Sequence, residues 1–321
     1  MKVAIIGAGL AGLTLASRLA ARHDVSVFEK ARGPGGRMST RRADPYAFDH
    51  GAQYFTAETD RFRAFLQPFR ETGSIAPWPE TVELVGGARL SSKEKWVAAP
   101  GMNALCKKLA EDLSLQTQVH VERLKRGPDG WSLIDLNGAK IGPFDWVVST
   151  APSAQSAALL PKNFTGQSEL QKAEMMGCFA LMLGFESPLD LAWTALKSGT
   201  PPIGWMAINS DKPGRPTPCS LLIQSDNEWA EAHLESDPDQ IRATLLEAAS
   251  SLAGTDLSIA PHQAMHRWRY AATRKSTDAP FLLDSELQLA ACGDWCLGGK
   301  VEAAFLSASE LADEFDTLSG T

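Results

Sequence analysis

Hydrophobic residues follow two different spacings in the first part of the chain. Residues 2–6 form a short apolar run, which is typical of a strand buried on both faces of a parallel sheet. Residues 10–21 carry apolar side chains at helical spacing, and residues 25–29 form a second apolar-rich run. The order of strand, helix and strand predicts a βαβ unit at the start of the chain.

Patterns of the same kind return later. We predict a helix at residues 101–110, a hairpin at residues 119–124 and 131–135, and a buried strand at residues 145–150. A further strand, at residues 287–291, precedes a long helix. The apolar stripe of that helix consists of Val301, Ala304, Phe305, Ala308, Leu311, Ala312 and Phe315. The end of the chain therefore repeats the strand and helix order of its beginning.

The intervening stretch has a different character. Mixed strands are predicted at residues 178–185, 220–224 and 262–270. Between the last two of them, a helix carries Ile241, Leu245, Ala248, Ala249 and Leu252 on one face. Residues 212–218 contain too many prolines for regular structure and are expected to form a loop. We interpret this stretch as an insertion between two parts of one sheet-based domain.

The turn after the first predicted strand is rich in glycine. Gly7-x-Gly9-x-x-Gly12 follows that strand directly, and Ala11 and Gly12 open the predicted helix. Glycines in this spacing allow a tight turn and let the backbone approach a pyrophosphate, which the helix N-terminus then faces. Glu29 ends the second strand about 20 residues on, where a carboxylate that binds ribose is expected. The strand, the helix and the acid together predict dinucleotide binding.

A second glycine turn, Gly35-Gly36, follows Glu29 and has Arg37 beside it. An NAD site would need only the βαβ unit. We therefore interpret the second turn as crossing another part of a longer cofactor, with Arg37 against its phosphates or its flavin edge. The alternative is an ordinary glycine loop with a solvated arginine.

These residues carry a family resemblance. Residues 35–40 resemble the glycine doublet of the flavin-containing amine oxidase superfamily, whose cofactor is FAD. Residues 49–57 are similar to the segment that follows this doublet in renalases, particularly the bacterial ones, and residues 100–102, 266–271 and 292–302 match that family too. The likeness runs from residue 2 to about residue 312. One departure is Ala303, because the family usually has glycine there.

The resemblance implies an α/β fold. A discontinuous Rossmann-like FAD-binding domain of the GR2 type would carry an inserted α+β substrate domain with a mixed or antiparallel sheet. We place the FAD-binding domain at residues 1–57, 100–155 and 285–321, and the substrate domain at residues 58–99 and 156–284. The expected FAD contacts besides Gly7, Gly9, Ala11, Gly12 and Glu29 are Gly36, Arg37, Met38, Ala52, Gln53, Val121, Asp294, Val301 and Glu302.

FAD carries the redox chemistry in such a protein, so only a few polar groups need to converge on the substrate. We expect Tyr54, Phe55 and Thr56 to line the substrate site and Gln53 to act at it. His266 is the best ionisable candidate, since it could bind a substrate amide or accept a proton near neutrality. A core histidine satisfied by the backbone is the alternative, and His50 is a weaker candidate for the same role.

The renalase resemblance implies an FAD oxidase that takes hydride from 2- or 6-dihydro isomers of NAD(P). It would return β-NAD(P)+, and dioxygen would take the electrons to give hydrogen peroxide. Another reading within the superfamily is an amine oxidase or desaturase of a different small substrate. A third reading keeps FAD as a structural or sensory group without enzymatic turnover.

Composition narrows the partners and the compartment. The formal net charge of −7 over 321 residues disfavours a nucleic-acid partner, and no apolar run reaches the length of about 18 residues that a membrane helix needs. The five cysteines form no disulfide framework, and Cys292 and Cys296 lack a second pair that could complete a zinc site. We therefore expect a cytoplasmic protein without a metal ion. The sequence does not indicate its oligomeric state.

Overall fold

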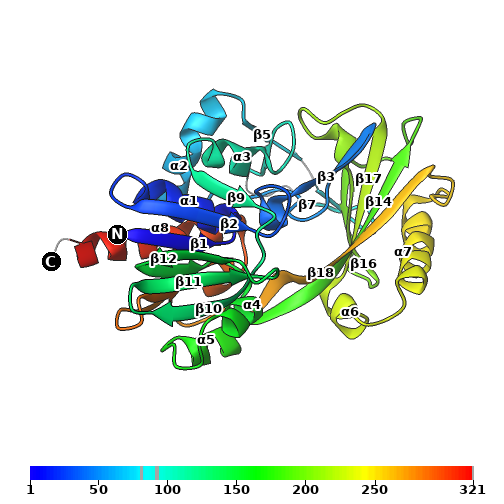
Figure 1. Ribbon diagram of the computed structural model, residues 1–321. Coiled ribbons are helices and arrows are strands. Elements are labelled where there is room, and N and C mark those ends of the chain that lie inside the picture. The colour runs from blue at the N-terminus through cyan, green and yellow to red at the C-terminus, as the bar shows by residue number, and fades with distance from the viewer. Residues whose placement is uncertain (80–81, 91–93, 320–321) are drawn as a thin grey trace. The chain divides into compact units, whose positions relative to one another are not determined.

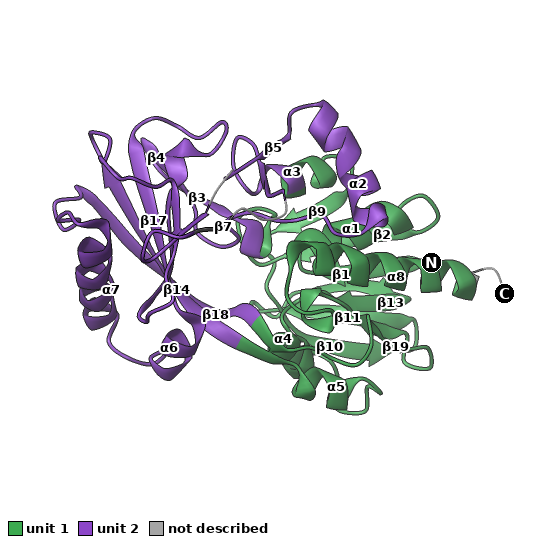
Figure 2. Cartoon of the chain, turned by 180° about the vertical axis from the view of Figure 1, so that it is seen from behind, with its two compact units in different colours: residues 1–36, 106–175, 273–321 green, residues 37–105, 176–272 purple. Residues whose placement is uncertain are grey.

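The structure is a computed structural model that describes residues 1–79, 82–90 and 94–319. Its chain divides into two compact units, which Figure 2 distinguishes by colour. Unit 1 consists of residues 1–36, 106–175 and 273–321, and unit 2 of residues 37–105 and 176–272. Each unit has its own sheets and its own hydrophobic core.

Unit 1 contains a six-stranded sheet, visible in Figure 1. In spatial order its strands are β19 (Leu282–Asp284), β20 (Leu289–Ala291), β13 (Trp146–Ser149), β1 (Lys2–Ile6), β2 (Asp24–Glu29) and β9 (Ser114–Thr117). Only the edge strand β19 pairs antiparallel; the remaining pairs are parallel. A parallel sheet with its first two strands joined through a helix is the arrangement that the βαβ pattern predicts.

Helices and a smaller sheet accompany the central sheet of unit 1. Helices α1 (Leu10–Leu19) and α8 (Val301–Ser319) pack against each other along their length. The smaller, antiparallel sheet consists of β10 (Val121–Gly127), β11 (Gly130–Asp135) and β12 (Lys140–Phe144). Two short helices, α4 (Ser153–Leu159) and α5 (Gln167–Lys172), follow β13.

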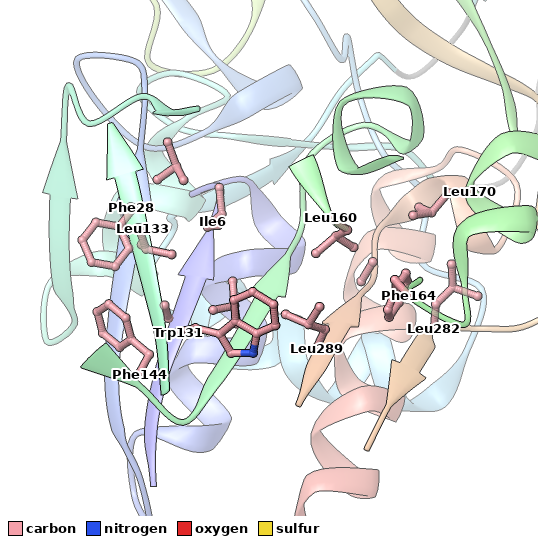
Figure 3. Close-up of a cluster of buried hydrophobic side chains, with 14 of the residues drawn as sticks. Ile6, Phe28, Trp131, Leu133, Phe144, Leu160, Phe164, Leu170, Leu282 and Leu289 are labelled. Atoms are coloured by element: carbon pink, nitrogen blue, oxygen red, sulfur yellow. The ribbon is translucent and has the colours of Figure 1, made fainter. Parts of the chain in front are cut away.

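The core of unit 1 lies between the two sheets (Figure 3). Ile6 and Phe28 of the central sheet pack there with Trp131, Leu133 and Phe144 of the smaller one. The edge of the Phe28 ring meets Phe144 at a centroid distance of 5.8 Å. Because successive side chains of a strand point to opposite faces, Val3 and Ile5 fill the other face of β1, where both are fully buried.

Unit 2 contains a seven-stranded sheet. Its strands, in spatial order, are β18 (His262–Lys275), β14 (Glu174–Phe185), β17 (Cys219–Ser225), β16 (Ile203–Ile208), β15 (Ala195–Lys197), β6 (Val82–Leu84) and β7 (Arg89–Leu90). Helix α7 (Pro238–Ala253) buries Ile241, Leu245 and Ala249 in the core of this sheet. A side-chain oxygen of Asp237 accepts from two N–H groups and caps the start of this helix.

Unit 2 contains a further hairpin and several shorter elements. The hairpin of β3 (Thr40–Ala43) and β4 (Tyr46–Asp49) packs Tyr46 and Phe48 against Ala180, Met182 and Leu222. The remaining elements are α2 (Asp60–Glu71), β5 (Ile75–Pro77), β8 (Trp96–Ala98) and α6 (Asn227–Ala232). Helix α3 (Ala104–Ala110) begins in unit 2 and belongs to unit 1 from Cys106 on. Three short 3-10 turns complete the chain: η1 (Gly36–Met38), η2 (Asn209–Asp211) and η3 (Asp294–Cys296).

The predicted fold class, an α/β unit with an inserted unit built on a mostly antiparallel sheet, is confirmed. Several strands were not anticipated, and β9 and β12 of unit 1 are examples. β9 is short and has no buried residue, and β12 contains Gly142-Pro143, so neither shows the apolar run on which strand prediction relies. The predicted helix at residues 101–110 is shorter, beginning at Ala104.

Packing divides the chain differently from the predicted domains. Residues 37–57 and 100–105 belong to unit 2, although we assigned them to the FAD-binding domain. Compactness alone does not decide which residues bind a cofactor, so the assignment stays a prediction. The predicted ranges 58–99 and 285–321 also include residues 80–81, 91–93 and 320–321, which lie outside the described residues.

The close approach of α1 to the first turn gives a test of the fold. A Cβ atom at position 12 would stand 2.0 Å from the carbonyl oxygen of Gly7, which is backbone and cannot rotate away. We expect Gly12→Ala to lower the free energy of unfolding by about 1–3 kcal/mol, the usual effect of overpacking. Urea unfolding followed by circular dichroism measures it. Gly33→Ala is the matched control, since no described atom lies within 4 Å of a Cβ there. Equal stability of the two variants would contradict the packing described.

Candidate functional site

The first glycine turn of unit 1 leaves a helix N-terminus open. Gly7 has a φ of +113°, a conformation that side-chain-bearing residues rarely adopt, and the turn leads directly into α1. No side chain caps that helix at Gly9, and none of the residues in its described first turn is acidic. No described atom lies within 4 Å of a Cβ built on Gly9. The first N–H groups of α1 therefore suit an anionic group that comes close to the backbone.

The second glycine turn lies against the first. The N–H of Gly35 donates to the carbonyl oxygen of Ala8 over 2.9 Å, and a Cβ on Gly36 would stand 3.4 Å from Cα of Gly9. Gly36 has a φ of +52°, so the left-handed region is used here as well. Gly9 and Gly36, which are 27 residues apart in the sequence, thus bring the two turns together into one glycine-lined surface.

Glu29 lies beside this surface. Its carboxylate accepts from the N–H of Ala8 over 2.9 Å and from the N–H of Ala31 over 2.7 Å, which fixes the side chain at the end of β2. Each carboxylate oxygen can accept more than one hydrogen bond, so capacity remains for a hydroxyl group. The open helix end for a phosphate and the fixed carboxylate for a ribose together fit the adenosine diphosphate part of a dinucleotide.

The remaining expected cofactor residues of unit 1 lie at the starts of β10 and α8. Val121, the first residue of β10, belongs to the same core as Phe28. Asp294 is buried, and its carbonyl oxygen accepts from the N–H of Gly299 over 2.9 Å, in the turn before Val301 begins α8. Glu302 and Ala303 are both buried in the first turn of that helix. The methyl group of Ala303, which departs from the family pattern, is therefore accommodated.

In unit 2 the segment after the second glycine turn is folded back on itself. The carbonyl oxygen of Arg37 accepts from the N–H of Ala52 over 2.8 Å, and a Cβ on Gly51 would stand 2.0 Å from that oxygen. Only glycine fits at position 51. Met38 is buried, while the side chain of Arg37 is half-buried. This contact brings two predicted cofactor residues, Arg37 and Ala52, together.

A buried carboxylate stands at the centre of this segment. Oδ2 of Asp49 accepts from Nη2 and Nε of Arg215 over 2.6 and 3.1 Å, and Nζ of Lys212 lies 3.4 Å away. Its other oxygen accepts from the hydroxyl of Thr40 over 2.7 Å and from the N–H of Met102 over 2.9 Å. The side chains of Asp49, Lys212 and Arg215 are completely inaccessible to solvent. Asp49 thus joins three segments of unit 2: the hairpin of β3 and β4, the Met102 segment and the loop that carries Lys212 and Arg215.

Neighbouring cations keep the carboxyl group of Asp49 ionised. Burial alone would raise the pKa of Asp49, but the charges of Lys212 and Arg215 and the N–H of Met102 outweigh it and lower the pKa to about 2. Burial lowers the pKa of Lys212 to about 8, and the charge of Arg215 adds to this effect, although the charge of Asp49 acts in the opposite direction. The carboxylate of Asp49 is therefore paired with two cations, Lys212 and Arg215, and the three side chains together carry a net positive charge at neutral pH.

Gln53 is held by the same network. Its Nε2 donates to the carbonyl oxygens of Asp49 and Gly51, over 2.5 and 3.0 Å, and its Oε1 accepts from Nζ of Lys212 over 3.2 Å. Both donor positions of the amide are used within the protein, and the side chain is buried. Its assignments as a catalytic and a cofactor-binding residue stay predictions. What the geometry shows is a fixed amide whose orientation is set by Lys212.

The two candidate histidines form one cluster with a tryptophan. The rings of His50 and His266 meet edge to face at 5.0 Å, and both contact Trp268, whose indole N–H donates to the carbonyl oxygen of His50. Burial and the neighbouring His266 lower the pKa of His50 to about 4. Burial and the charge of Arg41 also lower the pKa of His266. Both imidazoles are therefore uncharged at neutral pH, and His266 is half-buried.

The predicted substrate residues differ in their exposure. Tyr54 and Thr56 are half-buried, whereas Phe55 is buried and contacts the ring of Phe62 at 6.2 Å. The backbone of Phe55 pairs with that of Trp96 in an isolated bridge. Tyr54 contacts Trp205 at a ring distance of 5.6 Å, and burial raises its pKa. Phe55 thus packs in the interior, while Tyr54 is partly accessible.

Sequence reasoning missed the roles of Lys212 and Arg215. Both lie in the proline-rich stretch that we predicted only as a loop, 163 and 166 residues from Asp49. Asp49 itself was noted only as part of the family-like segment. The sequence showed only two basic residues in a proline-rich stretch. Such a stretch does not indicate which carboxylate the two residues pair with.

Comparison with known proteins identifies the family. A profile described as flavin containing amine oxidoreductase matches residues 85–314, well over half of the chain, and one described as NAD(P)-binding Rossmann-like domain matches residues 5–69. The chain belongs to the flavin-containing amine oxidoreductase family. Its cofactor is accordingly FAD, as predicted from the two glycine turns, and the features of unit 1 described above fit the adenosine diphosphate part of FAD.

Individual proteins are similar to the chain in two ways. Fifty-two residues are 48% identical to 4,4'-diapophytoene desaturase of Staphylococcus aureus, which is 16% of this chain and 10% of the desaturase. The match therefore spans only about a tenth of the length of that relative. Among solved structures, a candidate protoporphyrinogen oxidase from Exiguobacterium sp. 255-15 has a TM-score of 0.76 at 12% identity, and covers 98% of both chains.

Cyclohexylamine oxidase from Brevibacterium oxydans IH-35A has a TM-score of 0.71 at 13% identity, covering 98% of this chain and 99% of that one. At such identities the structures share the fold, and the renalase type in particular is not distinguished by them. Within the described residues no helix is both long and apolar enough to cross a membrane, and no group of three or more candidate ligands could hold a metal ion. All five cysteines are free and buried.

Removing the charge of Asp49 tests whether this carboxylate stabilises the buried Lys212 and Arg215. Asp49→Asn leaves two buried cations without their anion, and we expect the free energy of unfolding to fall by about 3–5 kcal/mol. Urea unfolding at pH 7 measures it. The matched control is Asp239→Asn, which breaks the exposed ion pair of Asp239 with Arg242 and should change stability by about 0.5 kcal/mol or less. A similarly small effect at Asp49 would disprove the coupling of the buried charges.

The lowered pKa of Lys212 predicts a dependence of stability on pH. Between about 8, its pKa in the fold, and the ordinary value of 10.5, the unfolded chain binds the proton and the folded chain does not. Lys212 therefore destabilises the fold below pH 8, and the free energy of unfolding rises with pH across this window, by at most about 1.4 kcal/mol per pH unit. Lys212→Met should remove this rise, while Lys197→Met, at an exposed site, should keep it. Parallel curves for Lys212→Met and the wild type would refute a lowered pKa.

Proposed function

We propose that the chain is an FAD-dependent oxidase that takes hydride from 2- or 6-dihydro isomers of NAD(P). The products are β-NAD(P)+ and, with dioxygen, hydrogen peroxide. The family membership supports a flavin-dependent oxidoreductase, and the resemblance of residues 49–57 to renalases supports this substrate class. The observation that carries the proposal is the charge around the predicted substrate residues.

Cations surround these residues in unit 2. Nζ of Lys95 lies 5.8 Å from the ring centre of Tyr54, and Nζ of Lys212 lies 3.2 Å from Oε1 of Gln53. The charge of Arg41 contributes to the lowered pKa of His266. Asp49 supplies one negative charge to the two cations Lys212 and Arg215, so a surplus positive charge remains. A dinucleotide with its phosphates is attracted to such surroundings, whereas an ammonium substrate is repelled.

The protein groups then need to bind and orient the substrate. FAD, when bound, accepts the hydride and passes electrons to dioxygen. Loss of hydride restores an aromatic pyridinium ring in the substrate, so no proton has to leave with it. An uncharged His266 suits this reaction, because its free ring nitrogen can accept a hydrogen bond from the carboxamide N–H of the substrate. Tyr54 supplies an aromatic face for the nicotinamide ring.

The second candidate is oxidation of an amine or desaturation of another small substrate. The fold likeness to cyclohexylamine oxidase and the short match to a desaturase support it. In unit 2 the tilted pair of Tyr54 and Trp205, with an interplanar angle of 50°, could contact such a substrate. The surrounding cations favour the dinucleotide over this candidate when the amine is protonated.

Anaerobic stopped-flow spectroscopy of the FAD-loaded protein separates the candidates. Isomers of NADH obtained by borohydride reduction of NAD+ should bleach the flavin at least about tenfold faster than ordinary NADH does, a difference of about 1.4 kcal/mol in activation free energy. Cyclohexylamine should bleach it no faster than ordinary NADH. Admission of air should then give one equivalent of hydrogen peroxide.

Each other outcome has a distinct meaning. Faster bleaching by cyclohexylamine would favour the second candidate. Equal rates with the isomers and with ordinary NADH would contradict the proposed substrate class. If none of these compounds reduces the flavin faster than free flavin is reduced, the chain holds FAD without enzymatic turnover.

A further inference from the structure

Two indole groups of unit 2 lack hydrogen-bond partners. The Nε1–H groups of Trp78 and Trp205 are both buried, and neither has an acceptor among the described residues. Trp78 is 6% exposed and Trp205 is 9% exposed. An unsatisfied buried donor destabilises a fold, so two of them in one unit require an explanation. A ligand that accepts hydrogen bonds would supply one.

These indoles lie beside a buried lysine and a tyrosine. The backbone N–H of Trp78 donates to the backbone carbonyl oxygen of Lys95 over 2.9 Å. This hydrogen bond continues the pairing of β5 with β8, so the side chains of Trp78 and Lys95 share a face of the sheet. Lys95 is 5% exposed, and its Nζ lies 5.8 Å from the ring centre of Tyr54, which in turn contacts Trp205. We refer to Tyr54, Trp78, Lys95 and Trp205 as the donor cluster.

The donor cluster offers mainly hydrogen-bond donors and few acceptors. Indole N–H and ammonium groups donate hydrogen bonds and cannot accept them, while the hydroxyl of Tyr54 can do both. A second cation adds to the charge, because Nζ of Lys212 lies 4.9 Å from the ring of Trp78. The half-buried Tyr54 gives the cluster access from solvent. Such a site favours a ligand with several acceptor oxygens and negative charge, and it disfavours an ammonium group.

We propose that the donor cluster binds an anionic oxygen group, a carboxylate or a phosphate, on a ligand whose flat ring packs against Tyr54 and Trp205. The two indoles and Lys95 donate to its oxygens. This proposal deepens the proposed function and rests on it only for the identity of the natural ligand, in which the phosphates of the dinucleotide isomer would supply the oxygens. The anion site itself stands on the donors, their burial and their charge.

Four small aromatic probes test the site in the FAD-loaded protein. Isothermal titration calorimetry is performed with benzoate, phenyl phosphate, benzamide and benzylamine, which share a ring and differ in the polar group. Benzoate or phenyl phosphate should bind at least about tenfold more tightly than benzamide, because charge-assisted hydrogen bonds are stronger than neutral ones, and benzylamine should bind most weakly. The stronger of the two anions indicates which oxygen group the site prefers. Benzylamine binding as tightly as either anion would overturn the proposal.

Variants locate the binding. Trp205→Phe keeps a ring and removes one donor, and Lys95→Met removes the charge; each should weaken anion binding by about tenfold or more. The matched controls are Trp193→Phe and Lys125→Met, at a half-buried tryptophan of unit 2 and an exposed lysine of unit 1, and these should bind as the wild type does. If the Trp205→Phe variant does not fold, Trp78→Phe is measured in its place, since it also removes one indole donor. Unchanged anion affinity in the cluster variants would overturn the proposal, since a solvent-filled or merely structural cluster predicts that result.

The two proposals fail separately. If benzoate or phenyl phosphate binds through the cluster but the NADH isomers do not reduce the flavin, the anion site is retained and the substrate class is wrong. If the isomers reduce the flavin but neither anion binds, the oxidase proposal is retained and the donor cluster has no part in it.

Discussion

The candidate substrate side of this protein depends on the buried carboxylate of Asp49. A carboxylate without solvent can stay ionised only if cations and N–H groups surround it, and Arg215, Lys212, Thr40 and Met102 do so. These partners come from separate segments, so the ion pair fixes the hairpin of β3 and β4, the start of the Met102 segment and the proline-rich loop at once. The amide of Gln53 donates to the backbone carbonyl oxygen of Asp49 and accepts from Lys212, so the segment that carries Tyr54 is fixed as well.

The nucleotide side depends on a different constraint, namely how closely two backbones can approach. The glycine turn of residues 7–12 and the turn at Gly35-Gly36 lie against each other, and side chains would separate them. Glu29 is held beside them by backbone N–H groups alone. This constraint is local in sequence, whereas that around Asp49 is not. The cofactor class can therefore be shared across a large family while the residues around the substrate differ.

This difference decides what could be predicted from the sequence. The βαβ unit and both glycine turns were predictable because the glycines that allow a positive φ stand together in short motifs, and because buried parallel strands are apolar throughout. The pairing of Asp49 with Arg215 spans 166 residues, and nothing in the proline-rich loop indicates that its two cations are buried. β12 was missed for a related reason: its pairing with β11 stabilises a strand whose own sequence, with Gly142-Pro143, does not favour one.

Membership in the family and the charge of the site bear on different questions. Family membership gives this chain FAD as its cofactor, and the solved structures at 12–13% identity share its fold, but a shared fold does not conserve the polar groups around a substrate. In unit 2, Lys95, Lys212 and Arg41 lie near the predicted substrate residues, and the nearby Asp49 is neutralised by Arg215. A protonated amine would have to enter against this positive charge. Because these charged groups are largely buried, salt screens their repulsion only weakly. The same charge attracts phosphates. Electrostatics, rather than the fold, is thus the property by which a dinucleotide and an amine are told apart.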